Sequence, residues 1–206
     1  MDPGINPTTQ PAQPETPSSG SFAPGAQASG SPTPRSRWGS VRMWTRDLVI
    51  SALVSAFIIM FLYQPVKVEG TSMLPGLEDQ ERIFINKFVY KFESIQRGDI
   101  VVFHYPRDPQ KSYIKRVIGV AGDRIVIRNG YVYVNGTLVP EPYVPVEYFD
   151  PRSCPEEVVP AGSYYVLGDH RTMSNDSRDF GPVDADFIYG KAVFVYWPMG
   201  KLGVLR

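Results

Sequence analysis

Cysteine and histidine are scarce in this sequence of 206 residues, which has one cysteine, Cys154, and two histidines, His104 and His170. A single cysteine excludes an internal disulfide and a cysteine-based zinc site. Two histidines are too few to build a multi-histidine metal centre. We predict that Cys154 is a loop residue rather than a nucleophile, because no histidine accompanies it locally.

An excess of charge of either sign is also missing. Lysine and arginine together number 21, aspartate and glutamate also number 21, and the formal net charge is zero. Nucleic-acid-binding proteins usually carry a basic surface that attracts phosphate groups. The charge balance therefore gives no indication of a nucleic-acid partner.

Large apolar residues are nearly absent from residues 1–34, which are rich in proline, glycine, serine, threonine, glutamine and alanine. Such a segment cannot bury enough apolar surface to offset the conformational entropy lost on folding. We predict a disordered tail over residues 1–34.

A basic segment with two tryptophans follows at 35–46, and an uncharged apolar run occupies 48–63. Cations and indole rings suit the headgroup region of a membrane. With the next few residues, the run approaches the length of about 20 residues that spans a bilayer. We predict a basic juxtamembrane segment at 35–46 and a transmembrane anchor helix at 47–66.

Two other interpretations of the apolar run fit less well. A cleaved secretory signal would begin nearer the N-terminus and end in a small-x-small cleavage site, which residues 64–69 do not contain. A buried core helix would show a polar face, and this run shows none. The four arginines before the run predict a cytoplasmic N-terminus. Residues 67–206 would then lie on the extracytoplasmic side, beyond a single membrane pass.

The chain after the run is rich in β-branched and aromatic residues between turn signals. The clearest hairpin is 125–134, because Asn129 and Gly130 suit the positive φ angles of a type I′ turn. The proline-rich stretch 140–160 is expected to be a long surface loop. We predict a mostly β domain after the one helix, with further strands at 82–88, 100–105, 112–120, 137–139, 163–167 and 187–197.

Lys115 lies in the middle of the expected strand 112–120. Alternate residues of a strand share a face, so Tyr113, Lys115 and Val117 point the same way. A lysine that faces an apolar core loses hydration, which lowers its pKa and favours the neutral amine that a general base requires. The alternative is a lysine whose stem packs while its ammonium group reaches solvent.

Ser72 follows the apolar run closely, in the stretch 70–75. A serine becomes a nucleophile when a base takes its proton, and a lysine with a lowered pKa can serve as that base. A third segment, 168–178, is dense in small polar and charged residues between two apolar strands, a common position for functional groups. There Asp176 and Arg178 could form a charge-assisted pair, and Ser174 could orient the lysine amine.

Two other chemistries remain open from these residues alone. A Ser-His-Asp triad could use His104 or His170, because triad members need not be near one another in the sequence. Asp169 and Asp176 could suggest calcium, although their spacing does not match an EF-hand loop.

Taken together and in order, these segments resemble the type I signal peptidases, membrane-bound serine-lysine proteases that remove signal peptides from exported proteins. The segments that carry the resemblance occupy most of the chain from Glu69 to Val183: 72–75, 97–103, 113–119 with 122–123, and 168–178. Each segment is modest alone, but the ordered set is highly specific.

The resemblance implies roles for particular residues. Ser72 matches the nucleophile and Lys115 the general base, Ser174 helps to orient the lysine, and Asp176 and Arg178 form a supporting pair. It also implies a mostly antiparallel β fold, preproteins bound as extended strands, a preference for Ala-x-Ala before the cleaved bond, and no metal or organic cofactor. The enzyme would act at a lipid bilayer, either a plasma or a thylakoid membrane.

This sequence departs from the commonest family pattern at four positions. Gly76 stands where threonine is usual and Ala121 where proline is frequent, and the other two positions are His170 and Gly70. His170 replaces a frequent asparagine, and Gly70 stands where some members have a serine whose hydroxyl helps to hold the oxyanion. We expect the backbone N–H of Ser72 to act with a second donor that the sequence does not identify. Two rival hypotheses are a serine-lysine protease with a narrower task and a membrane-anchored β domain that binds partners without catalysis.

Overall fold

The computed structural model describes residues 37–205. Its helices are α1 (Arg37–Leu62) and α2 (Ser177–Phe180). Its strands are β1 (Tyr63–Lys67), β2 (Arg82–Asn86), β3 (Ile100–Tyr105), β4 (Asp108–Gly119), β5 (Arg124–Arg128), β6 (Tyr131–Val134), β7 (Thr137–Leu138), β8 (Cys154–Val158), β9 (Ser163–Leu167), β10 (Val183–Asp184), β11 (Ile188–Trp197) and β12 (Gly203–Val204). The prediction of a disordered tail falls on residues 1–34, which lie outside the described residues.

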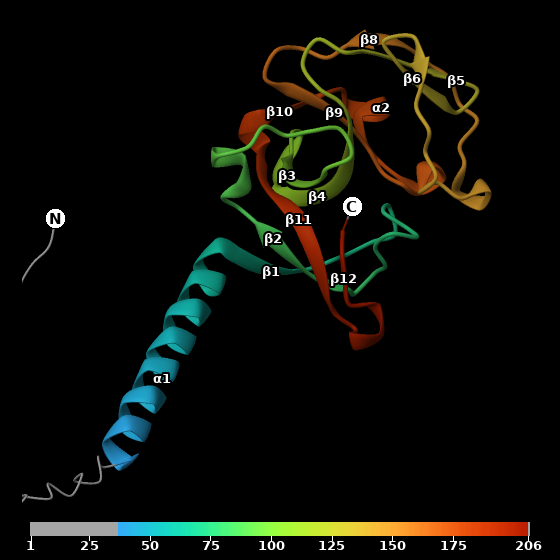
Figure 1. Cartoon of the computed structure of the whole chain (residues 1–206). Coiled ribbons are helices and arrows are strands. Elements are labelled where there is room, and N and C mark those ends of the chain that lie inside the picture. The colour runs from blue at the N-terminus through green and yellow to red at the C-terminus, as the bar shows by residue number, and fades with distance from the viewer. Residues whose placement is uncertain (1–36, 206) are drawn as a thin grey trace, which may run out of the picture. The chain divides into compact units, whose positions relative to one another are not determined.

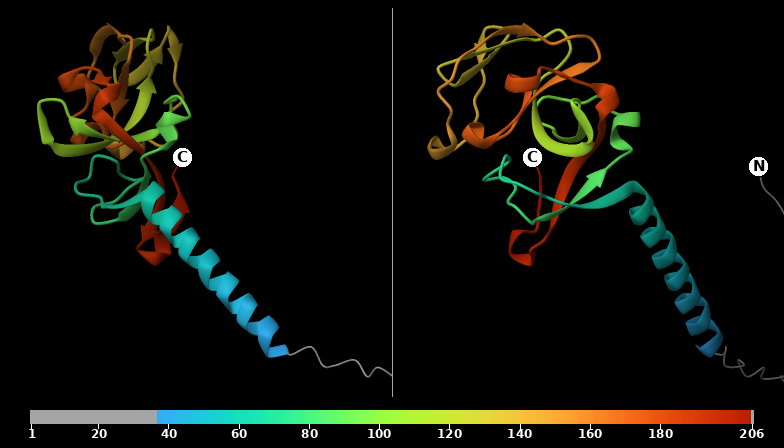
Figure 2. Two further views of the ribbon diagram at one scale, coloured as in Figure 1. Left: turned by 90° about the vertical axis from the view of Figure 1, so that its left-hand side faces the viewer. Right: turned by 180° about the vertical axis from the view of Figure 1, so that it is seen from behind.

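The strands form two antiparallel sheets (Figures 1 and 2). In Figure 1, β5, β6 and β8 of one sheet lie at the upper right, and β2, β3 and β11 of the other lie nearer the centre. The larger sheet has eight strands in the order β1-β2-β11-β3-β4-β9-β10, with β12 paired to β11. The smaller sheet has the order β7-β6-β5-β8. The prediction of a mostly β, antiparallel fold after one long helix is therefore confirmed.

Helix α1 contains a stretch, Arg42–Leu62, that is long and apolar enough to cross a membrane. None of the side chains in that stretch is buried within the protein. The expected span extended to residue 66, but the chain leaves the helix at Leu62 and pairs as β1 with β2. Pro65 explains the change, because proline disfavours helical conformation at the residue before it and is tolerated in an edge strand.

The hairpin prediction is confirmed in detail. Asn129 and Gly130 connect β5 to β6 with φ angles of 49° and 82°, the signs that a type I′ turn requires. The strands expected at 100–105 and 163–167 have the observed bounds of β3 and β9.

The expectation for residues 140–160 is wrong in part. They include a short 3-10 turn, Val146–Tyr148, and strand β8, whose first residue is Cys154. Cys154 is thus a strand residue rather than a loop residue. The proline signal misleads here because β8 is an edge strand, where Pro155 needs no ladder hydrogen bond on its open side.

Candidate active site

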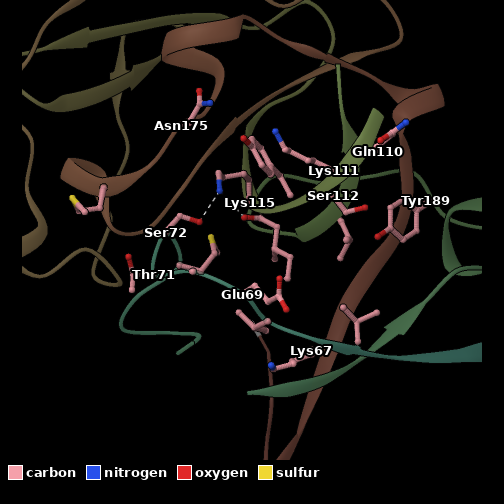
Figure 3. Close-up of a pocket in the computed structure, with 18 residues that line it drawn as sticks. Lys67, Glu69, Thr71, Ser72, Gln110, Lys111, Ser112, Lys115, Asn175 and Tyr189 are labelled. Carbon is pink, nitrogen blue, oxygen red and sulfur yellow. Dashed lines mark hydrogen bonds between the residues drawn. The ribbon is translucent and has the colours of Figure 1, made fainter. Parts of the chain in front are cut away.

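Ser72 and Lys115 are brought together across 43 positions of sequence. Lys115 Nζ lies 2.7 Å from Ser72 Oγ and 3.0 Å from the carbonyl oxygen of Ile114 (Figure 3). Only 3% of Lys115 is exposed, so its ammonium does not reach solvent as the alternative interpretation proposed. The ring of Tyr113, two positions earlier in β4, lies 5.1 Å from Nζ.

Burial lowers the pKa of Lys115 to about 8. Loss of hydration disfavours the charged amine, and Arg178 acts in the same direction, whereas the carboxylates of Asp176 and Asp169 partly oppose the shift. A substantial fraction of the lysine is therefore neutral near pH 8, and a neutral amine 2.7 Å from a hydroxyl can take its proton.

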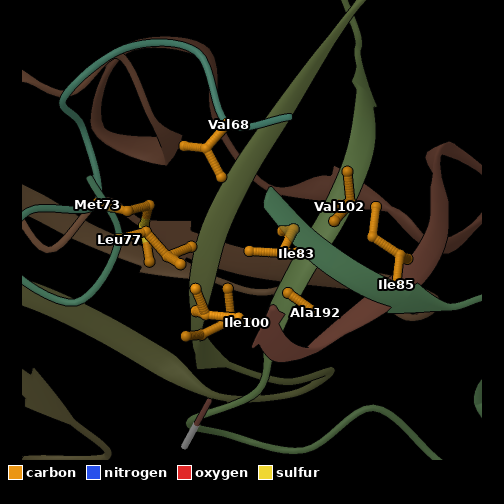
Figure 4. Close-up of a cluster of buried hydrophobic side chains, with 9 residues drawn as sticks. Val68, Met73, Leu77, Ile83, Ile85, Ile100, Val102 and Ala192 are labelled. Carbon is orange, nitrogen blue, oxygen red and sulfur yellow. The ribbon is translucent and has the colours of Figure 1, made fainter. Parts of the chain in front are cut away.

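The turn that carries Ser72 is anchored from inside. Met73 and Leu77 follow the serine and are buried in an apolar cluster that includes Val68 and Ile83 (Figure 4). Val68 precedes the serine and Met73 follows it, and the core fixes both side chains. The half-buried Ser72 between these two residues therefore has little freedom to move. Core packing thus determines where the hydroxyl points.

The segment 168–178 closes around this turn from the other side. The backbone N–H of His170 donates to the carbonyl oxygen of Ser72 at 3.1 Å. A Cβ atom at Gly168 would lie 2.5 Å from that same oxygen and 2.2 Å from the hydroxyl oxygen of Ser174. Only glycine permits this approach, so the close contact between the two segments depends on Gly168.

Asp176 and Arg178 form the ion pair that the sequence suggested. Arg178 Nε and Nη2 each lie 2.8 Å from a carboxylate oxygen of Asp176, and the two side chains expose 2% and 0%. The carboxylate also accepts from the backbone N–H of Gly168 at 3.0 Å and caps helix α2. Burial alone would raise the pKa of Asp176, but the hydrogen bonds and charge of Arg178 prevail and lower it.

Ser174 is buried in the same segment, but its expected contact with the lysine is not formed. Among residues 37–205, no group meets strict hydrogen-bond geometry at its hydroxyl oxygen, although the hydroxyl is close enough to Asp176 to help lower the pKa of that carboxylate. The predicted role of Ser174 in orienting Lys115 therefore stays a prediction.

A cleft of about 740 Å³ opens beside Ser72 and Lys115 (Figure 3). One wall is the segment 66–73, which runs from the end of β1 into the turn that carries Ser72. The other wall is residues 110–115 of β4, and Met173, Asn175 and Tyr189 also line the cleft. Residues 112–115 of β4 pair with β3 on one edge, whereas pairing with β9 begins only at Arg116. Within the described chain, the second edge of this segment is therefore unpaired.

The donors for an oxyanion are only partly visible. Among residues 37–205, the backbone N–H of Ser72 has no hydrogen-bond acceptor. Gly70 adopts a φ of +97°, which side-chain-bearing residues rarely adopt, and its N–H donates to Asp79 at 2.8 Å. A serine at this position would therefore be strained.

The two alternative chemistries find no support in the site. His170 Nδ1 lies 3.2 Å from the carbonyl oxygen of Thr71, and no histidine of the described chain is hydrogen-bonded to Ser72 Oγ. The carboxylates proposed for calcium are each engaged by an arginine, Asp169 by Arg116 and Asp176 by Arg178.

Sequence reasoning missed the ion pair of Arg116 with Asp169. Arg116 Nε and Nη2 donate to the two carboxylate oxygens at 2.9 and 2.7 Å, and the side chains expose 6% and 1%. The available signal was a charged residue within an otherwise apolar strand, because a buried charge needs a partner. What the sequence did not indicate was which carboxylate would provide it.

A family model described as "Signal peptidase, peptidase S26" matches residues 41–197. The chain belongs to this signal peptidase family. Signal peptidase IB of Staphylococcus aureus is 35% identical over 174 residues, covering 77% of this chain and 90% of that protein. Signal peptidase I of Bacillus caldolyticus is 42% identical over 161 residues, covering 72% and 87%.

A solved structure, a signal peptidase I from Enterococcus faecalis, has 32% identity and a TM-score of 0.43, covering 48% of this chain and 97% of that one. The resemblance inferred from sequence motifs is confirmed by the family match and the two relatives. This signal peptidase is a hydrolase, a serine endopeptidase that removes signal peptides.

Proposed function

We propose that this signal peptidase cleaves preproteins with Ser72 as nucleophile and Lys115 as general base, and that it prefers small residues, Ala-x-Ala, before the cleaved bond. The observation that carries the proposal is the 2.7 Å contact between Ser72 Oγ and the Nζ atom of a buried lysine. A serine and a base in this relation are the minimum for nucleophilic catalysis.

In the first half of the reaction, neutral Lys115 takes the proton of Ser72, and Oγ attacks the carbonyl carbon at the signal-peptide junction. The backbone N–H of Ser72 has no intramolecular acceptor within the described chain and donates to the oxyanion. One such donor typically contributes about 3–4 kcal/mol of transition-state stabilisation. Lys115 then passes its proton to the leaving amine, which leaves an acyl-enzyme on Ser72.

In the second half, Lys115 takes a proton from water, and the resulting hydroxide attacks the ester carbonyl. The proton returns to Ser72 Oγ as the ester bond breaks, and the cleaved signal peptide leaves with a new carboxylate. Lys115 can act in both steps because its amine is held in one position. The amine is buried and donates a hydrogen bond to the carbonyl oxygen of Ile114.

The cleft suits an extended peptide. The unpaired edge of residues 112–115 can accept backbone hydrogen bonds from one more strand, a common way to bind peptides. Val68, Val102 and Ile114 are among its lining residues, so small apolar side chains fit near the serine. This arrangement supports a preprotein segment with small residues as the substrate.

We further propose that α1 anchors the enzyme in a bilayer, with the N-terminus cytoplasmic and the catalytic domain, residues 67–206, on the extracytoplasmic side. Ser72 follows the last helical residue, Leu62, by ten positions. At ~3.3–3.6 Å per residue, the nucleophile lies within roughly 35 Å of the end of the span. A signal peptide is also membrane-bound, so its junction emerges in the same zone.

The test is cleavage of a preprotein with an Ala-x-Ala junction by the full-length protein in detergent. We expect Ser72→Ala and Lys115→Ala each to abolish cleavage without loss of the folded state measured by circular dichroism. The matched controls, Ser94→Ala and Lys87→Ala, change exposed residues outside the cleft and should cleave normally. Near-normal turnover by either site variant would contradict the dyad, and equal cleavage of a junction with phenylalanine in place of the last alanine would contradict the small-residue preference.

A further inference from the structure

Residues 140–153, which we term the strap, join β7 to β8 and lie against the site segment 168–178. Three strap side chains contact the site segment directly, and a fourth contacts Arg116, which is the ion-pair partner of Asp169 in that segment. The four are Glu141, Tyr148, Asp150 and Tyr143, and none of them lines the catalytic cleft within the described chain. The strap therefore touches the site only from outside.

The strap begins with a buried ion pair. Glu141 accepts from Arg171 Nη1 at 2.9 Å and from Nη2 at 2.5 Å, and the two side chains expose only 11% and 4%. Arg171 Nε in turn donates to the carbonyl oxygen of Gly168 at 3.0 Å. Glu141 thus fixes the position of Arg171, and Arg171 in turn fixes Gly168. Gly168 is the residue that packs closely against the carbonyl oxygen of Ser72.

Tyr143 joins this ion pair to the one beside it. Its hydroxyl donates to Glu141 at 3.0 Å, and its ring lies 4.1 Å from the guanidinium carbon of Arg116. Arg116 is the partner of Asp169, the residue after Gly168. Both ion pairs of this region therefore share one strap tyrosine.

The second half of the strap contacts the site segment near both of its ends, at His170 and at Arg178. The ring of Tyr148 packs on the ring of His170 at 4.1 Å between centroids, and the backbone N–H of His170 donates to Ser72. Asp150 accepts from Arg178 Nη1 at 3.1 Å, while Arg178 holds the buried Asp176. Each of these four strap side chains is thus connected, through one or two other residues, to Ser72 or to a carboxylate near Lys115.

We propose that the strap is a positioning element for catalysis: Glu141, Tyr143, Tyr148 and Asp150 hold the site segment so that Ser72 and Lys115 keep their productive separation. The inference rests on the proposed function of that pair. Displacement of a reacting group by about 1 Å can lower turnover roughly a hundredfold, so a support that acts only through other residues can still determine the rate.

A loosened strap should also change how Lys115 titrates. The groups that face the lysine are Ser72, Tyr113, Asp169, Asp176 and Arg178, and three of these belong to the site segment that the strap holds. If that segment moves outward, water reaches the amine and the pKa of Lys115 rises toward its ordinary value. The acid limb of the activity profile then moves to higher pH, whereas loss of folded protein would scale the profile without moving it.

The experiment compares Glu141→Gln with Glu156→Gln in the full-length protein in detergent, with an Ala-x-Ala substrate from pH 6 to 10. Both variants remove one carboxylate charge, but Glu156 pairs with Arg124 on the exposed face of the smaller sheet. We expect Glu141→Gln to lower kcat about tenfold or more, to leave KM within twofold, and to shift the acid limb upward. We expect Glu156→Gln to match the wild type.

A second pair of variants covers the case in which Glu141→Gln does not fold. Tyr148→Ala removes the ring that packs on His170, and Tyr148→Phe keeps it; we expect the loss and the pH shift only with alanine. An unshifted profile, whether at full or uniformly reduced activity, would overturn the positioning role. If the wild type and Glu156→Gln both fail to cleave, it is the proposed function that fails, and the two failures are therefore distinguishable.

Discussion

A buried ion pair beside the eight-stranded sheet can be compared with an exposed ion pair on the four-stranded sheet. Beside the eight-stranded sheet, Arg178 and Asp176 expose 2% and 0% of their side chains. Across the four-stranded sheet, Arg124 and Glu156 expose 61% and 45%. Both are arginine-carboxylate pairs joined by hydrogen bonds, so the contrast lies in their surroundings rather than in their chemistry.

This contrast indicates what each kind of pair contributes. An exposed pair gains little, because water and salt screen the charges. For a buried pair, the free energy of attraction between the charges barely offsets the free energy lost when both charges leave water. Removing one partner is nevertheless strongly destabilising, because it leaves an unpaired buried charge. The buried pairs gather around Ser72 and Lys115, where the proposed chemistry needs a fixed geometry rather than extra stability.

The strongest way to break the comparison is Asp176→Ala. The change leaves the buried guanidinium of Arg178 with only the more exposed Asp150 as a carboxylate partner, and it leaves the N–H of Gly168 without an acceptor. We expect the free energy of unfolding to fall by about 3–5 kcal/mol, as is usual when one member of a buried pair is removed. Urea titration of the purified protein followed by tryptophan fluorescence measures the loss, and a change below about 1 kcal/mol would contradict it.

Gly168→Ala tests the contact between the site segment and the Ser72 turn. The new Cβ would lie 2.5 Å from the carbonyl oxygen of Ser72, so one of the two segments must move. We expect kcat/KM to fall about a hundredfold or more. Gly200→Ala is the control, because a Cβ there meets nothing within 4 Å; equal activity of the two variants would show that the close approach does not matter.

Lowering the pH tests the burial of Lys115 without any substitution. The base must be neutral, and with a pKa of about 8 the neutral fraction falls as the pH falls. Between pH 8 and pH 6 we expect kcat/KM to decrease about fiftyfold. The profile is measured with a substrate that has no titrating group in this range, and a flat profile would exclude Lys115 as the base.

Glu156→Gln is expected to have the smallest effect. It weakens an exposed pair on the smaller sheet, so the free energy of unfolding should change by less than about 1 kcal/mol. Urea titration beside Asp176→Ala gives the direct contrast between the two sheets. A loss as large as that of the buried aspartate would show that exposure does not separate the two kinds of pair.

Much of the fold could be predicted because its signals are local. Alternating β-branched residues, the Asn129-Gly130 turn and the apolar run each depend on a few neighbouring residues, and the structure forms the corresponding elements. The missed elements are those in which distant contacts override a local signal. Strand β8 forms although Pro155 lies within it, because pairing with β5 stabilises it from one side. The helix α2 was missed for a different reason, because its four residues are too few to show helical periodicity.

The candidate site was predictable in its residues but not in its contacts. The order of the motifs indicated Ser72 and Lys115. The alternation of the strand did not decide whether the amine of Lys115 is buried or reaches solvent. Their separation of 2.7 Å and the 3% exposure of the lysine arise because the Ser72 turn packs against strand β4, where Lys115 lies 43 positions away in sequence. No local pattern encodes that meeting.

The class of this protein could be read from the chain alone, because the apolar helix, the β-rich domain and the ordered signal peptidase motifs each depend on residues close together in sequence. The pairing of Glu141 with Arg171 and the packing of Tyr148 on His170 could be seen only once the folded chain was known. The reason is physical. A charge or a ring specifies the kind of partner it needs, but which partner it meets depends on how the whole chain packs.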